Sequence, residues 1–336
     1  MPEIKDPTVE FAEMAAVVAP RYGTGEVLRI ERVARPNPRA GEVLVRVRAA
    51  AVCQGDAHLL TGTPYLLRLG FGLRRPKDPV IGHDLAGEVV AVGAGVAGFR
   101  PGDRVFGQVG SGAFAEYACV CAQRLAPAPV GASFEELAAV PDSGMTALQG
   151  LRDAGRLRAG QRVLINGASG GVGTFAVQLA KALGAQVTAV CSTRHLAAVR
   201  TLGADHVIDY TAADFTAGAA RYDVLLDLVG NRTLRDCRRV LTPKGVFVSS
   251  AGAPGGNWAG PVLWMGKMML ANLFVRQRIA VHLMRPQRSD LEYLADLVAA
   301  GKVRPLIERH HPLAQAAAAV QHVIDGHAQG KTVIVV

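Results

Sequence analysis

A run of glycines at residues 167–173 constrains the fold of this chain more than any other sequence feature. The run reads Gly167-Ala-Ser-Gly170-Gly171-Val-Gly173, follows an apolar segment at 162–166 and precedes an amphipathic segment at 171–183. Glycines permit a tight turn and a close backbone approach to a pyrophosphate, and the N-terminus of the following helix directs free N–H groups toward negative charge. A tight turn without a ligand is the alternative, but strand, helix and spacing together predict dinucleotide binding. The expected contacts are Ser169, Gly170, Gly171, Val172 and Gly173.

The segments around this turn alternate between strand-like and helix-like patterns. Strands are expected at 162–166, 186–191, 206–208, 222–228 and 246–250, with helices at 171–183, 194–202 and 232–241. Short apolar strands separated by helices are typical of a doubly wound parallel sheet. Residues 15–127 instead combine strand-like runs at 42–52 and 84–92 with glycine turns, which indicates a curled β-sheet. The pattern Ser133-Phe-Glu-Glu136 predicts the start of a helix, which Pro141 should end or kink.

The end of the second expected strand bears on which dinucleotide binds. NAD-preferring sites carry an Asp or Glu there, which holds the ribose hydroxyls, whereas this chain reads Val190-Cys-Ser-Thr-Arg194. A carboxylate would repel a 2′-phosphate, while Ser192, Thr193 and Arg194 can donate hydrogen bonds to it. We therefore expect NADP(H). The alternative is that these three residues only cap a helix and face solvent.

Bulk properties exclude several classes of function. The formal net charge is +9, but the basic residues are spread along the chain without a nucleic-acid-binding motif. The most apolar late segment, 261–275, contains Lys267 and Asn272 and is too short to span a bilayer. The N-terminus is acidic, unlike a secretory signal, and the five cysteines show no disulfide-framework spacing. We expect a cytoplasmic protein with a small-molecule substrate and with neither a nucleic-acid nor a membrane partner.

Six stretches of the chain carry a family pattern that covers it from about residue 15 onward. They are Gly41-Glu-Val-Leu-Val-Arg-Val47, Ile81-Gly-His-Asp-Leu-Ala-Gly87, Pro101-Gly-Asp-Arg-Val105, Gly144-Met-Thr-Ala-Leu148, 167–173, and Leu202-Gly-Ala-Asp-His-Val-Ile-Asp-Tyr210. With them the chain resembles the medium-chain dehydrogenase/reductase superfamily, nearest its quinone-reductase-like branch.

This resemblance implies an α/β fold in three ranges. A GroES-like β-rich catalytic domain would span residues 1–142, a Rossmann domain with a doubly wound parallel sheet 143–277, and residues 278–336 would return to the catalytic domain. The resemblance also implies a homodimer or homotetramer and hydride transfer between the nicotinamide and a carbonyl, alcohol, quinone or enone. Further cofactor contacts would come from Thr146, Tyr210, Val229 and Gly252.

Zinc-dependent members of the superfamily hold a catalytic metal at three positions. These are a Cys in a Cys-x-Ser/Thr-Asp-x-His run, a His in Gly-His-Glu, and a Cys or Asp just before a Gly-x-Thr helix. This chain carries Cys53, His83 and Asp142 there. A thiolate, an imidazole and a carboxylate would leave one zinc position open for a substrate oxygen, which the metal would polarise.

Neighbouring residues follow the zinc-dependent pattern in part. Asp56 would orient His83, Asp84 would add a carboxylate near the metal, and His58 is a candidate proton relay. Gly55 replaces the hydroxyl residue that relays the proton, Asp84 replaces Glu, and the four-cysteine structural zinc lobe is absent from the sequence.

Each metal candidate also has an interpretation without a metal. Cys53 could be a small buried residue, His83 a core histidine and Asp142 a helix N-cap. The leading hypothesis is a zinc-assisted alcohol dehydrogenase or carbonyl reductase, the second is a zinc-free NADPH quinone or enone reductase, and the third is a non-enzymatic NADPH-binding protein. Metal content separates the first two, and turnover of any carbonyl or quinone excludes the third.

Overall fold

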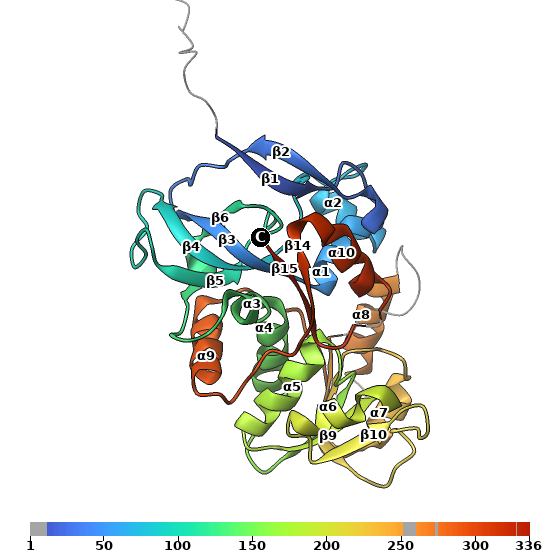
Figure 1. The fold of residues 1–336 in the computed structure, drawn as a ribbon. Helices are drawn as coiled ribbons and strands as arrows, with labels where there is room; N and C mark the ends of the chain where they lie inside the picture. Colours follow the sequence, from blue (N-terminus) through green and yellow to red (C-terminus); the bar gives the residue numbers. More distant parts are fainter. Residues whose placement is uncertain (1–11, 251–259, 273–274, 327) are drawn as a thin grey trace, which may run out of the picture.

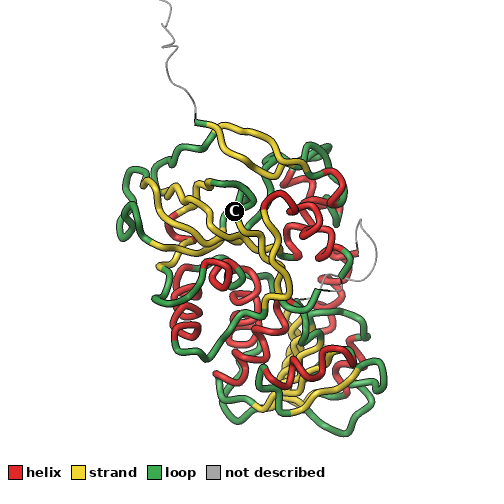
Figure 2. Tube along the Cα trace, in the orientation of Figure 1, coloured by secondary structure: helices red, strands yellow, loops and turns green. Residues whose placement is uncertain are grey.

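The computed structural model describes residues 12–250, 260–272, 275–326 and 328–336, and it contains two large sheets joined by helices (Figures 1 and 2). One sheet has six parallel strands in the order β10-β9-β8-β11-β12-β13. They are β8 (Arg162–Asn166), β9 (Gln186–Cys191), β10 (His206–Asp209), β11 (Tyr222–Asp227), β12 (Leu241–Ser249) and β13 (Arg278–Val281). This is the strand order of a doubly wound dinucleotide-binding fold, and it reverses between β8 and β11.

Helices cover both faces of this sheet, so the alternating side chains of its central strand are buried in two different clusters. Val163 and Ile165 of β8 share a buried cluster with residues of α5 (Gly171–Ala182), whereas Leu164 packs in a second cluster with residues of α7 (Leu234–Arg239) and α8 (Gly260–Ala271). The remaining helix of this unit, α6 (Leu196–Thr201), follows a 3-10 turn at Thr193–His195. The expected strands and helices between residues 162 and 250 are present with small shifts at their ends.

The second sheet has seven strands and forms the GroES-like part of the fold. Six strands lie in the order β14-β15-β3-β4-β5-β7, and β6 pairs with β3 in addition. They are β3 (Glu42–Val52), β4 (Asp84–Val92), β5 (Arg104–Gln108), β6 (Tyr117–Cys121), β7 (Leu125–Pro127), β14 (Ile307–Pro312) and β15 (Lys331–Val335). The predicted fold class is therefore confirmed. The final strand β15 pairs antiparallel with β3, so the end of the chain lies in this sheet.

The elements between the sheets place one end of β3 against the dinucleotide-binding unit. They include α3 (Phe134–Ala138), α4 (Pro141–Gln149) and a π-helical turn at Gly150–Ala154. The predicted capping box is present, since the Ser133 hydroxyl accepts from the Glu136 N–H at 3.1 Å and the Glu136 carboxylate accepts from the Ser133 N–H at 3.1 Å. α3 ends before Pro141, which instead begins α4, where its missing N–H costs no hydrogen bond.

Small side chains let these layers approach one another. Ala49 and Ala51 of β3 are fully buried in the cluster that also contains Leu137 of α3, Leu148 of α4 and Val163 of β8. One continuous core therefore joins the two sheets. It fixes the position of the residues that follow β3 relative to the glycine turn.

Further elements complete the surface. Strands β1 (Glu13–Val18) and β2 (Arg29–Ala34) pair with each other. The helices are α1 (Gln54–Thr61), α2 (Arg68–Phe71), α9 (Arg288–Ala299) and α10 (Ala316–Ile324). Short 3-10 turns lie at Gly25–Val27, Tyr65–Leu67, Ala122–Arg124 and Leu313–Gln315. Among the described residues, no helix combines the length and apolar character needed to cross a bilayer.

Candidate functional site

Cys53 and Asp56 lie where β3 passes into α1. Cys53 is the residue before the first turn of α1 and is buried, and the Asp56 carboxylate accepts a hydrogen bond from the Cys53 backbone N–H at 2.8 Å. An acidic side chain in the first helical turn satisfies a backbone donor that the helix leaves free. The local sequence therefore both starts the helix and fixes a carboxylate beside a thiol.

His83 meets Asp56 from the other side of the site. Its Nδ1 lies 2.5 Å from Asp56 Oδ1, and the ring keeps 16% of its side-chain surface exposed. Burial alone would lower the pKa of His83, but the charge of Asp56 and the hydrogen bond to it raise that pKa to about 9. The bond to Asp56 therefore fixes the orientation of the His83 ring.

The carboxylates of Asp84 and Asp142 lie near the pair of Asp56 and His83, since the charges of both raise the pKa of His83. Both Asp84 carboxylate oxygens lie 3.1–3.2 Å from the backbone N–H of Asp142, and Gln108 Nε2 donates to Asp84 at 3.3 Å. Burial raises the pKa of Asp84 to about 7, although the nearby charge of Lys331 acts to lower it. Burial likewise raises the pKa of Asp142. Two carboxylates in so small a buried space require a cation or a proton.

Lys331, the first residue of β15, supplies a cation that the sequence analysis did not predict. Its side chain is only 2% exposed, and its Nζ lies 3.6 Å from Asp84 Oδ2. Among the residues that the structure describes, Nζ has no hydrogen-bond partner. The charge of Asp84, followed by those of Cys53 and Asp142, raises the pKa of Lys331 against the effect of burial. A charged ammonium therefore lies inside the acidic cluster.

The donor atoms of this cluster suit a divalent cation. Cys53, Asp56 and His83 each place one possible ligand atom within 4.8 Å of the others. Both Asp56 oxygens already accept hydrogen bonds, from Cys53 and His83. Asp142, the third ligand expected from the resemblance, is not one of these three residues, although its charge acts on both Cys53 and His83. Burial and the charges of Asp56, Asp142 and Asp84 raise the pKa of the Cys53 thiol well above its ordinary range, and a bound dication would oppose that effect.

The other catalytic candidate, His58, lies on α1 outside this cluster. Its Nδ1 lies 3.0 Å from the carbonyl oxygen of Thr63, so Nδ1–H donates to that carbonyl. The ring is half-buried. Its Nε2 stays available for a proton, but among the described residues the His58 side chain forms no hydrogen bond with Cys53 or His83.

The glycine turn lies directly beside the acidic cluster. A side-chain carbon at Gly173 would lie 2.1 Å from the Gly167 carbonyl oxygen, so only glycine allows this close approach. The Gly330 backbone N–H donates to the Ser169 carbonyl at 2.9 Å, and a side-chain carbon at Gly171 would lie 3.3 Å from Lys331 Cδ. The lysine side chain therefore passes from the glycine turn toward Asp84.

The residues expected to read the 2′-phosphate follow β9. Arg194 is exposed and Ser192 is half-buried, whereas the Thr193 hydroxyl donates to Asp209 at 2.5 Å. Tyr210 is half-exposed. His195, next to Arg194, is buried, and its Nδ1 has no hydrogen-bond partner among the described residues.

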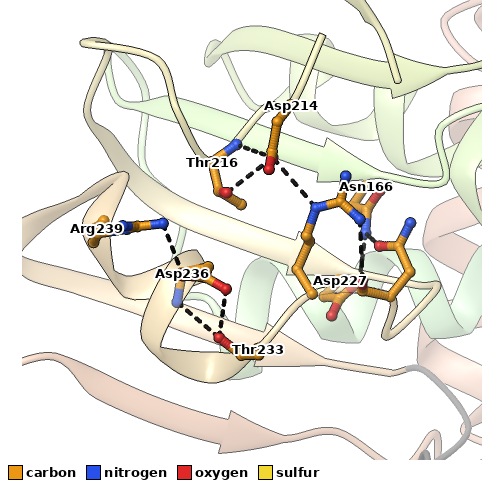
Figure 3. A network of polar contacts seen from close by, with 9 residues as sticks. Asn166, Asp214, Thr216, Asp227, Thr233, Asp236 and Arg239 are labelled. Atoms are coloured by element: carbon orange, nitrogen blue, oxygen red, sulfur yellow. Dashed lines mark hydrogen bonds and ion pairs between the residues drawn. The ribbon is translucent and has the colours of Figure 1, made fainter. Parts of the chain in front are cut away.

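A buried polar network holds the loop after β11, at the point where the strand order reverses (Figure 3). The Asn166 side chain donates to Asp227 at 2.8 Å, and the backbone N–H groups of Val229 and Gly230 donate to the same carboxylate at 3.2 and 3.0 Å. The network holds Val229, an expected cofactor contact, beside the glycine turn, since a side-chain carbon at Gly167 would lie 2.7 Å from Val229 Cγ2. Thr146 lies on α4, and Gly252 lies outside the described residues.

Sequence and structure comparisons identify the family. Residues 39–130 match the alcohol dehydrogenase GroES-like domain, and residues 202–334 match the zinc-binding dehydrogenase family. The chain is 35% identical over 334 residues to the chloroplast envelope quinone oxidoreductase homolog of Arabidopsis thaliana, covering 93% of this chain and 95% of that protein. The chain belongs to the medium-chain dehydrogenase/reductase superfamily.

Other relatives agree with this assignment to the superfamily and its quinone-oxidoreductase-like branch. The NAD(P)H oxidoreductase RTN4IP1, mitochondrial, of Danio rerio is 33% identical over 368 residues, covering 96% of this chain and 91% of that protein. The solved quinone oxidoreductase from Coxiella burnetii matches with a TM-score of 0.85 and 30% identity, covering 97% of this chain and 100% of that chain. This protein is therefore an oxidoreductase.

Proposed function

We propose that this protein transfers a hydride between NADP(H) and a carbonyl or alcohol substrate at a zinc ion held by the buried cluster. The observation that carries this proposal is the bond between Asp56 and His83, in which a carboxylate fixes a histidine beside a thiol. Ligating histidines in metal sites commonly donate their second ring nitrogen to such a carboxylate. A histidine needed only for packing would not require this arrangement next to Cys53.

The proposed cofactor is NADP(H). The strand order, the glycine turn and the position of Val229 at the reversal point support a dinucleotide there. Arg194 is exposed at the end of β9, where no carboxylate follows directly, and this supports the phosphorylated form. Asp209 lies close to Thr193 but belongs to the next strand.

Cys53, His83 and Asp142 are the residues that we propose hold zinc. When bound there, zinc would act as a Lewis acid that polarises the substrate oxygen. Asp56 orients His83, and Asp84 with Lys331 balances charge behind the ligands. The surplus of acidic groups over Lys331 and His83 supports the presence of a dication.

A zinc-free reductase of quinones or enones is the second candidate. One observation favours it: Lys331 already places a cation within the acidic cluster. The named functions of the Arabidopsis and Coxiella relatives point the same way. Here Cys53 and His83 would only pack and position neighbouring groups.

Substrate screening tests the proposed activity. Purified protein and NADPH would be mixed with aldehydes, ketones, quinones and enones, before and after dialysis against a chelator. The zinc proposal predicts carbonyl reduction that the chelator abolishes and added zinc restores. Quinone or enone reduction that survives full metal removal would support the second candidate, and no turnover of any acceptor would leave a dinucleotide-binding protein.

We also propose a homodimer or homotetramer in a reducing compartment such as the cytoplasm. All five cysteines are free, including the exposed Cys121, which supports reducing conditions. Light scattering of the purified protein would measure the oligomer size directly.

A further inference from the structure

The segment between α1 and β4 presents large apolar side chains to solvent. It contains the 3-10 turn at Tyr65–Leu67 and the short helix α2. Leu69 and Leu73 are 70% and 68% exposed, and Leu66 and Phe71 are also exposed. We call these four residues the apolar platform. Four such residues within eight positions form a patch, whereas isolated exposed apolar side chains are common on protein surfaces.

The platform is held in place by contacts around Arg68. Its guanidinium lies 4.4 Å from the Tyr22 ring centroid and 4.6 Å from that of Tyr65, and its Nε donates to the Gly62 carbonyl at 2.9 Å. The Tyr22 hydroxyl donates to the Gly72 carbonyl at 2.5 Å. These contacts satisfy backbone carbonyls of the segment from within the protein, and the apolar side chains of the platform remain exposed to solvent.

Glycine at position 72 keeps the turn after the platform compact. Gly72 has a φ of +119°, and a side-chain carbon there would lie 2.0 Å from the Arg75 carbonyl oxygen. The compact turn therefore brings Arg75 and its basic neighbours close to the platform.

Basic residues border the platform. Arg74, Arg75 and Lys77 follow it directly, and Arg21 precedes Tyr22, whose hydroxyl contacts the segment. All four are exposed, and none of their side chains forms a hydrogen bond or ion pair with another described residue. Asp78 is the acidic residue in this stretch, so the border carries a net positive charge.

We propose that the platform and its basic border dock on an anionic lipid surface. Aliphatic and aromatic side chains that protrude can enter the hydrocarbon boundary, while arginine and lysine remain at the lipid phosphates. A second copy of this chain is disfavoured as the occupant, because it would bring an identical basic border against the first. A protein partner would need a matching apolar groove, whereas lipid deforms around protruding side chains.

The placement of the platform agrees with such docking. Figure 1 shows α2 at the end of the molecule that carries β1 and β2, away from β9 and β10 of the dinucleotide-binding sheet. A lipid surface at this end would leave the expected cofactor residues after β9 facing solution. Such a contact lies at the lipid surface and needs no membrane-spanning segment, in contrast to the expectation from the sequence that the protein has no membrane partner. The proposal goes beyond the proposed function and does not depend on zinc.

Vesicle co-sedimentation tests the proposal. Full-length protein would be mixed at low salt with phosphatidylcholine vesicles that contain or lack roughly one third phosphatidylserine. One variant combines Arg74→Ala, Arg75→Ala and Lys77→Ala, and a second combines Leu69→Ser and Leu73→Ser. The matched control removes three exposed basic residues elsewhere, by Arg158→Ala, Arg162→Ala and Arg235→Ala. Melting temperature and NADPH binding of each variant would report whether the fold is intact.

Wild type should sediment with the anionic vesicles and remain in solution with phosphatidylcholine alone. The basic variant should bind about a hundredfold more weakly, since each arginine or lysine near the surface contributes about fivefold. The leucine variant should lose about tenfold or more because its apolar contact is removed. The proposal is overturned if wild type does not bind anionic vesicles, which is the result expected of a surface that docks a protein. It is also overturned if the control variant loses as much vesicle affinity as the basic variant, or if the leucine variant binds the vesicles as tightly as wild type.

Discussion

Lys331 and Asp84 form an ion pair in which both side chains are buried, with Nζ 3.6 Å from Oδ2. The pair connects the last strand of the chain to the first residue of β4. Because Lys331 also passes beside the glycine turn, it joins the expected cofactor region to the acidic cluster. The charge of Lys331 therefore stabilises the ionised carboxylate of Asp84.

Replacing Lys331 should destabilise the protein strongly. Lys331→Met keeps much of the side-chain volume but removes the buried ammonium that pairs with Asp84. The free energy of unfolding should fall by about 3–5 kcal/mol. Urea unfolding measures it. The control is Lys181→Met, whose partly exposed pair with Asp205 should contribute less than about 1 kcal/mol. Equal losses in the two variants would contradict the role given to Lys331.

The loss in the free energy of unfolding caused by Lys331→Met should also depend on pH when a chelator is present. The pKa of Asp84 rises from its ordinary 3.8 to about 7, so its contribution to stability is complete below 3.8 and is lost as pH rises through 7. Removing Lys331 disfavours the carboxylate further. We therefore expect a larger deficit at pH 8 than at pH 5 in unfolding experiments, and a deficit independent of pH would show that Asp84 is not the affected group.

The glycine turn should tolerate no side chain at position 173. Gly173→Ala would force a carbon to within 2.1 Å of the Gly167 carbonyl oxygen, which separates the helix from the turn that is expected to bind pyrophosphate. Calorimetry should show at least about a tenfold loss of NADPH affinity, because contacts to charged groups contribute about 1.5–3 kcal/mol. Gly218→Ala is the control, since open space surrounds that position. Unchanged NADPH binding by Gly173→Ala would refute the assignment of the turn.

Arg194 should determine the preference for the phosphorylated cofactor. Arg194→Ala should lower kcat/KM with NADPH by about tenfold to a hundredfold, the equivalent of a lost charge-assisted contact, and change kcat/KM with NADH little. Arg200→Ala removes an exposed arginine from the neighbouring helix and serves as the control. Equal kcat/KM values of wild type with NADPH and with NADH would contradict this role of Arg194.

Local sequence patterns predicted much of the fold because they report local structure. The bounds of β3 and β4 agree with the expected strands, and the Ser133 capping box begins α3 as expected. β14 was not predicted, because its sequence Ile307-Glu-Arg-His-His-Pro312 lacks regular apolar alternation. Pairing with β15, which local sequence does not reveal, holds that strand in place.

The candidate site was predictable only where residues follow a family pattern. The contact between Asp56 and His83 was expected from that pattern, and the structure contains it. Lys331 was missed because lysines are rarely buried and nothing in its local sequence marks burial. Its environment is created by Asp84 and Asp142, which are distant in the chain and approach only in the folded protein.

The zinc content of freshly purified protein tests the central claim most directly. Elemental analysis of wild type, prepared without chelator, should find close to one zinc per chain, in line with one catalytic site and no structural site. Cys53→Ser and Asp142→Ala should lose zinc together with carbonyl reduction. Wild type that contains no metal and still reduces quinones or enones at full rate would contradict the account and assign Cys53 and His83 to packing.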